Sequence, residues 1–177
     1  MKNLGKKLKI KGWAILTALL VISAVSSAQI VIKSENNNEK IVITQKNNTW
    51  KHTSKSGLNS FNSEYKGEIE VTNDDKDIRS ISPGGYLEIS KTTFGSKREI
   101  LIEAASGGAL RREYYEGRKK TDWEPAGKKW LAEILPEIVR STGIAAKSRV
   151  DRFYKQGGVD AVLNEIIRLD GNYVVSI

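Results

Sequence analysis

The sequence predicts an α+β fold: an antiparallel β-meander or sheet followed by three or more amphipathic helices. Two observations support this prediction. From residue 29 to about 115, apolar side chains recur at every second position between clusters of Gly, Asn, Asp and Ser. After Pro125 the apolar residues recur at steps of three and four. We therefore expect a β region at residues 29–124 and a helical region at residues 125–177 that packs on the sheet.

The β region is marked by short apolar pairs with polar or charged residues between them. The pairs are Ile30 and Ile32, Ile41 and Ile43, Ile69 and Val71, Leu87 and Ile89, Ile100 and Ile102, and Leu110 and Tyr114. Such alternation buries one face of an antiparallel sheet and leaves the other in water. Residues 47–63 are polar apart from Trp50, Leu58 and Phe61, and they predict no single structure.

The helical region shows three apolar stripes. The first runs from Trp130 to Val139 and can end at Gly143, the second lies between Ala146 and Gly157, and the third runs from Val159 to Ile167. Residues 172–177 are typical of the first turns of a fourth helix. Two interpretations stay open: the chain is a truncated start of a longer helical array, or these residues form a short terminal turn docked on the third helix.

The N-terminal segment predicts export. Five lysines precede an apolar run from Trp13 to Val25, and no acidic residue occurs before Glu35. This run of 13 residues is shorter than the roughly 20 needed to span a bilayer. Small residues end at Ala28, so we expect a signal peptide at residues 1–28, cleaved between Ala28 and Gln29. The alternative is an uncleaved anchor, in which case the protein contacts the membrane through this segment only.

The charge balance depends on that assignment. The whole chain has 29 basic and 21 acidic residues, a net charge of +8. Removal of residues 1–28 takes away five lysines and no acidic residue, which leaves a net charge of +3 and little support for nucleic-acid binding. The chain has no cysteine, so disulfides, thiolate metal sites and cysteine nucleophiles are excluded.

Two segments resemble a known bacterial module. They are the stretch from Gly67 to Ile89, which includes Ser82-Pro83-Gly84-Gly85-Tyr86, and the helical stretch with Leu135-Pro136 and Gly157-Gly158. They are similar to an uncharacterised exported module found behind membrane metallopeptidase sensors of the beta-lactamase-regulator type. The peptidase part, with its HExxH motif, is absent from this chain. The resemblance implies the layout alone, strands first and helices after.

The densest basic and aromatic cluster lies around residues 111–123. Its candidate binding residues are Arg111, Arg112, Tyr114, Arg118, Lys119 and Trp123, accompanied by Tyr115 and Lys120. Such a cluster can receive an anionic partner. The simpler interpretation is an edge hairpin that uses its charges to prevent unwanted strand pairing.

Three further motifs are weak. His52, the only histidine, has no partner nearby in sequence and is expected to be exposed. Ser63 and Lys66 match the SxxK pattern of penicillin-recognising enzymes, but the companion motifs are missing. Asn73, Asp75 and Asp77 alternate like calcium ligands, yet position six of the loop is Ile78, where glycine is required, so a polar turn is favoured.

These observations predict no catalytic residue, no metal site and no cofactor. The expected function is a non-enzymatic interaction or sensing module of the bacterial cell envelope, periplasmic or extracellular, whose partner is an envelope protein or peptide. The alternatives are a carboxylate-dependent hydrolase, for which Asp74 and Asp75 are one example of a carboxylate pair, and a structural envelope component that self-associates.

Overall fold

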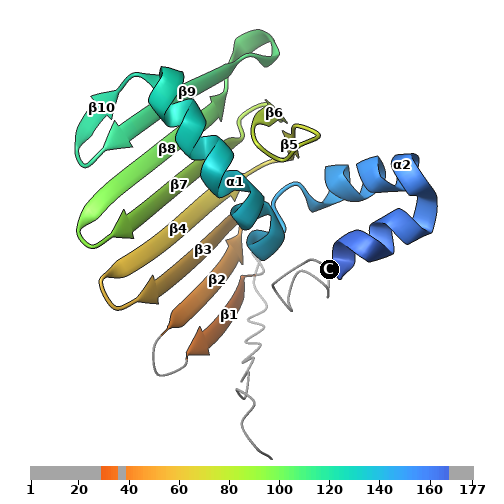
Figure 1. Ribbon diagram of the computed structural model, residues 1–177, viewed down its shortest axis with the longest axis horizontal. Coiled ribbons are helices and arrows are strands. Elements are labelled where there is room, and N and C mark those ends of the chain that lie inside the picture. Colours follow the sequence, from red (N-terminus) through yellow and green to blue (C-terminus); the bar gives the residue numbers. More distant parts are fainter. Residues whose placement is uncertain (1–28, 36–38, 168–177) are drawn as a thin grey trace, which may run out of the picture.

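The computed structural model describes residues 29–35 and 39–167 (Figure 1). Eight strands form one antiparallel sheet in the order β1-β2-β3-β4-β7-β8-β9-β10. They are β1 (Ile30–Glu35), β2 (Lys40–Lys46), β3 (Thr49–Ser56), β4 (Asn59–Lys66), β7 (Tyr86–Thr93), β8 (Ser96–Ala104), β9 (Leu110–Glu116) and β10 (Lys119–Thr121). The predicted antiparallel sheet is therefore present, and its strands follow each other as a meander. The predicted signal peptide, residues 36–38 and the predicted fourth helix lie outside the described residues.

Residues 47–63, for which the sequence predicted no single structure, form most of the β3–β4 hairpin. The two-residue loop Asn47–Asn48 joins β2 to β3, and both of its residues have positive φ, 50° and 60°. Asparagine tolerates this conformation better than most residues, and such loops match the twist of a hairpin. The turn chemistry and the pairing with β2 and β7 therefore make strands of a segment with few apolar residues.

A small hairpin interrupts the meander between β4 and β7. Its strands β5 (Ile69–Val71) and β6 (Ile78–Ile81) pair with each other as a separate two-stranded sheet. Gly85 closes the insertion, where a Cβ atom would lie 2.6 Å from the carbonyl oxygen of Lys66. Only glycine permits this approach of two backbone segments. The apolar side chains of β5 and β6 extend the core beyond the end of the main sheet.

The first predicted helix is present as α1 (Lys128–Thr142), and it ends at Gly143 in the left-handed conformation, as expected. It lies across one face of the sheet, which we call the inner face (Figure 1). The core between them contains Leu87, Ile89, Ile100, Ile102 and Tyr114 of the sheet, all at most 1 % exposed. From α1 it contains Trp130, Leu131, Ile134, Leu135, Ile138 and Val139.

The prediction of three or more amphipathic helices covering the sheet is wrong: the described residues contain two α-helices. Residues 146–166 form one helix, α2 (Ala146–Ile166), which bends at Gly157 and Gly158 where the backbone leaves helical geometry. The sequence interpretation treated this glycine pair as an end of one helix and a start of the next. Helix α2 projects away from the sheet (Figure 1), and only Arg149 of its residues is buried.

Helix α2 is attached mainly by arginines rather than by an apolar stripe. The Arg149 guanidinium pairs with Asp75, 3.2 Å away, and also with Glu165, which belongs to α2 itself. Arg152 pairs with Asp75 at 2.8 Å and donates a second hydrogen bond of 2.8 Å to the carbonyl of Thr72. Several large apolar side chains of α2 are exposed, namely Val150, Tyr154, Val159 and Leu163. Within the described part of the chain, no helix is long and apolar enough to cross a membrane.

Candidate functional site

In the part of the chain that the structure describes, only part of the width of the inner face is covered. Adjacent strands lie about 4.8 Å apart, so eight of them span about 34 Å, whereas the 15 residues of α1 make a helix about 22 Å long. One helix cannot cover eight strands, and among the described residues the main core contains no side chain from β1, β2 or β3. The inner side chains of these three strands include Ile32, Ile41, Ile43, Trp50 and His52, which share a face by register.

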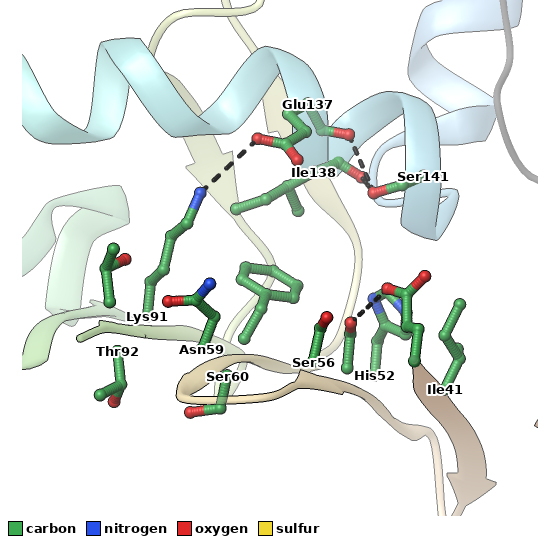
Figure 2. Close-up of a pocket in the computed structure, with 14 residues that line it drawn as sticks. Ile41, His52, Ser56, Asn59, Ser60, Lys91, Thr92, Glu137, Ile138 and Ser141 are labelled. Carbon is green, nitrogen blue, oxygen red and sulfur yellow. Dashed lines mark hydrogen bonds and ion pairs between the residues drawn. The ribbon is translucent and has the colours of Figure 1, made fainter. Parts of the chain in front are cut away.

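A groove lies where the uncovered strands meet α1, and we call it the inner groove. It has a volume of about 460 Å³. Residues of β3 and β4 line it on the sheet side, and the second half of α1 forms the opposite wall. Figure 2 shows His52 and Lys91 on the sheet, facing Glu137, Ile138 and Ser141 on α1. The other residues used below are Glu39, Ile41, Ser54 and Phe61.

The groove combines apolar surface with polar groups at its edges. Ile41, Phe61 and Ile138 supply the apolar surface. At one edge the Ser54 hydroxyl donates a 2.7 Å hydrogen bond to the Glu39 carboxylate. At the other edge the Lys91 ammonium lies 4.0 Å from the Glu137 carboxylate (Figure 2). Apolar concave surfaces with a few convergent polar groups are typical of binding sites.

His52 lies in this groove and is partly buried, so the expectation of an exposed imidazole is wrong. Its ring packs edge-on against Phe61, with ring centroids 5.7 Å apart. Burial lowers the pKa of His52, and the nearby Glu39 carboxylate opposes that shift in part. Its Nδ1 atom is buried and has no hydrogen-bond partner among the described residues. The Ser63 hydroxyl, directly opposite on β4, is also buried and unpaired.

The serines near His52 do not form a catalytic pair in which a base activates a nucleophilic hydroxyl. The Ser54 hydroxyl is bonded to a carboxylate rather than to the imidazole. Ser63 is 1 % exposed, and it faces the core while Lys66, three residues later on the same strand, faces the opposite side. The SxxK residues are therefore not brought together. The described residues contain no group of three or more His, Cys, Asp or Glu that could hold a metal ion.

The predicted calcium-like residues are bound by arginines instead of facing one another. Asp75 is bound by Arg149 and Arg152. Asp77 pairs with Arg112 at 2.5 Å, and the Asn73 side chain accepts a 2.8 Å hydrogen bond from Arg79. The polar turn is thus the interpretation that fits these contacts.

The predicted basic and aromatic cluster is divided between the two faces of the sheet. Arg111 lies on the outer face and pairs with Glu103. Arg112 lies on the inner face, where its guanidinium binds Asp77 and lies 5.3 Å from the ring centroid of Trp123. Successive residues of a strand point to opposite faces, so the two arginines cannot serve one ligand.

The remaining members of this cluster are mostly occupied. Tyr114 is buried under α1 and donates a 2.8 Å hydrogen bond to Glu116, and its burial raises its pKa to about 12. Lys120 pairs with Glu113 at 2.8 Å. Arg118 and Lys119 are exposed at the β9–β10 turn. Two exposed cations at a sheet edge match the protective role better than an anion site.

Sequence reasoning missed a pair of carboxylates on the outer face. Glu64 and Glu88 lie directly opposite each other on β4 and β7. A hydrogen bond from Tyr86, 2.5 Å long, lowers the pKa of Glu64, whereas burial and the charges of Glu99 and Glu64 raise the pKa of Glu88. Opposed shifts are a property of acid and base pairs, yet neither residue lines the inner groove.

Comparisons of the chain with protein-family models, curated proteins and solved structures found no match. The assignment of a function therefore depends on the geometry of the inner face.

Proposed function

We propose that the chain is an exported, non-enzymatic interaction module of the bacterial cell envelope, and that the inner groove binds a segment of a partner protein. The observation that supports this proposal is the inner face of β1–β3 beside α1, whose side chains lie outside the main core of the described residues. This face presents apolar side chains and a groove of about 460 Å³ to solvent. A large contiguous apolar patch on the surface of a domain is typical of an interaction site.

The chemistry of the groove favours a polypeptide as the ligand. Its serine hydroxyls, the His52 imidazole and the Glu39 and Glu137 carboxylates can exchange hydrogen bonds with main-chain amides. Phe61 and Ile41 can contact apolar side chains of the same ligand. Both charge signs are present and partly paired, so a strongly charged ligand gains little here.

Site-specific photo-crosslinking in the exporting bacterium tests this proposal. A photoreactive phenylalanine analogue replaces Ser54, whose side chain lines the groove, or Thr53, the next residue on β3, which faces the other side. The proposal expects a crosslinked protein adduct from position 54 and none from position 53. Equal adducts from both positions, or none from either, would contradict it.

Export is tested separately by the mass of the protein recovered outside the cytoplasm. Cleavage after Ala28 gives a chain that begins at Gln29 and has lost five lysines. A recovered chain that still begins at Met1 would support the uncleaved anchor instead. A chain found only in the cytoplasm would contradict the proposed localisation.

A further inference from the structure

The two edges of the main sheet differ in how they are protected. The edge strand β10 has three residues, Lys119, Lys120 and Thr121, and two of them are charged. The other edge strand, β1, has six residues and begins Ile30-Val31-Ile32. Short edge strands rich in lysine discourage pairing with another chain, whereas longer apolar ones permit it. The β1 edge is therefore the one able to accept a further strand.

We propose that β1 pairs antiparallel with β1 of a second copy of this chain, so that the two sheets join into one. An antiparallel pair of identical strands is related by a twofold axis and closes on itself, which gives a dimer rather than a fibre. Pairing of β1 with β10 of another copy would be open-ended and is opposed by the two lysines.

The sequence of β1 selects one register. Residues that face the inner side must lie opposite residues that also face it, if the inner faces of both copies are to lie on one side of the joined sheet. Ile32 opposite Ile32 of the second copy meets this condition, and it also places Ile30 opposite Ser34 and Val31 opposite Lys33. No two like charges are then opposed.

The neighbouring registers are worse. A shift of the pairing by one residue along each strand in one direction places Lys33 opposite Lys33 of the second copy, and like charges at directly opposed positions are destabilising. The same shift in the other direction leaves only Ile30, Val31 and Ile32 of β1 paired. The preferred register also places Ile30, which is now 41 % exposed, beside Ser34 of the second copy.

The joined sheet has a consequence for the inner face. The uncovered strands β1–β3 of one copy would continue into β1–β3 of the other, so the two inner grooves would flank a shared apolar strip. This pairing uses backbone groups at the sheet edge rather than the residues of the groove, so it can hold or fail independently of the proposed function.

Disulfide trapping tests the register, because the chain contains no cysteine of its own. The Ile32→Cys variant of the full-length chain, with its N-terminal segment, is expressed and purified. Opposed residues of an antiparallel pair have Cα atoms about 4.5–5.5 Å apart, which is within the range that a disulfide spans. We expect most of the Ile32→Cys protein to form a covalent dimer on mild oxidation. Lys120→Cys, on the β10 edge, is the matched control and should remain mostly monomeric.

Two further measurements make the outcome decisive. Sedimentation velocity of the unmodified chain should show a dimer at micromolar concentration, and Ile32→Lys, which opposes two cations at the twofold axis, should shift it to the monomer. Mixed Ile30→Cys and Ser34→Cys proteins should crosslink to each other. A monomeric unmodified chain, equal crosslinking at positions 32 and 120, or a dimer that persists in Ile32→Lys would overturn the proposal. A monomer whose β1 binds a strand of another protein would also overturn it.

Discussion

The two halves of the main sheet have the same topology but different surroundings. Under α1, the inner side chains of β7 and β8, such as Leu87 and Ile100, are 0 % exposed. In β1–β3 the comparable positions, such as Ile32 and Ile41, are partly exposed, and only Ile43 is buried among the apolar residues of these strands. For these isoleucines and leucines, the difference in exposure arises from the position of α1. In the described part of the chain, α1 stabilises the half that it covers, and the inner side chains of β1–β3 lie outside the main core.

We expect the largest effect on stability when equivalent isoleucines of the two halves are replaced by alanine. Ile100→Ala opens a cavity in the covered core and should lower the free energy of unfolding by about 2–5 kcal/mol. Ile41→Ala removes a side chain that is already partly in contact with water, and it should cost less than about 1 kcal/mol. Urea unfolding of the two variants measures both values. Equal losses would show that the face of β1–β3 is covered in solution.

The contrast between the halves was only partly predictable from the sequence. Alternating pairs such as Leu87 and Ile89 or Ile100 and Ile102 predicted strands correctly, because one buried face imposes a period of two. β3 and β4 were missed because they carry few apolar residues, and it is pairing with β2 and β7 that makes them strands. The Asn47–Asn48 turn was the available signal for this hairpin.

The helical region and the site show where local patterns fail. Val159 and Leu163 have helical spacing, but the pattern does not tell whether any surface lies opposite them, and in the structure they are exposed. The inner groove joins residues from β2, β3, β4, β7 and α1, so it depends on strand order and on the reach of one helix. The division of Arg111 and Arg112 between two faces, by contrast, follows from strand alternation and could have been predicted.

We expect the next largest effect on stability from a substitution in a hairpin loop. The β7–β8 loop places Phe94 at a positive φ of 48°, whereas the β2–β3 loop uses asparagine at both such positions. Phe94→Asn should therefore raise the free energy of unfolding by about 0.5–1 kcal/mol, because phenylalanine is strained there. Thermal denaturation measures this. Leu58→Asn removes an exposed apolar side chain from the β3–β4 loop without a positive φ to relieve, so as a control it should change stability little. An equal gain in both variants would contradict the backbone explanation.

The single histidine reports on the uncovered half. Burial lowers the folded-state pKa of His52 below its unfolded value of about 6.5. The unfolded chain therefore binds the proton more readily, and stability should fall as the pH drops below about 6.5. His52→Phe should remove this loss while leaving stability at pH 8 nearly unchanged. The imidazole titration by NMR measures the pKa directly, and Glu39→Gln should lower it further. A His52 pKa at or above 6.5 would contradict the burial of this ring.

We expect the smallest effect on the outer face of the sheet, where Glu64 and Glu88 lie opposite each other. Burial and two neighbouring carboxylates raise the pKa of Glu88, so the folded state is weakened as the pH rises and this group ionises. Glu88→Gln should raise stability at pH 7, by less than about 0.5 kcal/mol because solvent screens an exposed charge. Its neighbour Glu64 has a lowered pKa, so its contribution is present at pH 7 and is lost as the pH falls through that pKa. Glu64→Gln should therefore destabilise the protein at pH 7. Thermal denaturation of both variants at pH 7 and pH 4 shows whether each substitution stabilises or destabilises the protein. A gain from both substitutions would mean that general charge repulsion on this face, and not the Tyr86 and Lys51 contacts of Glu64, sets its electrostatics.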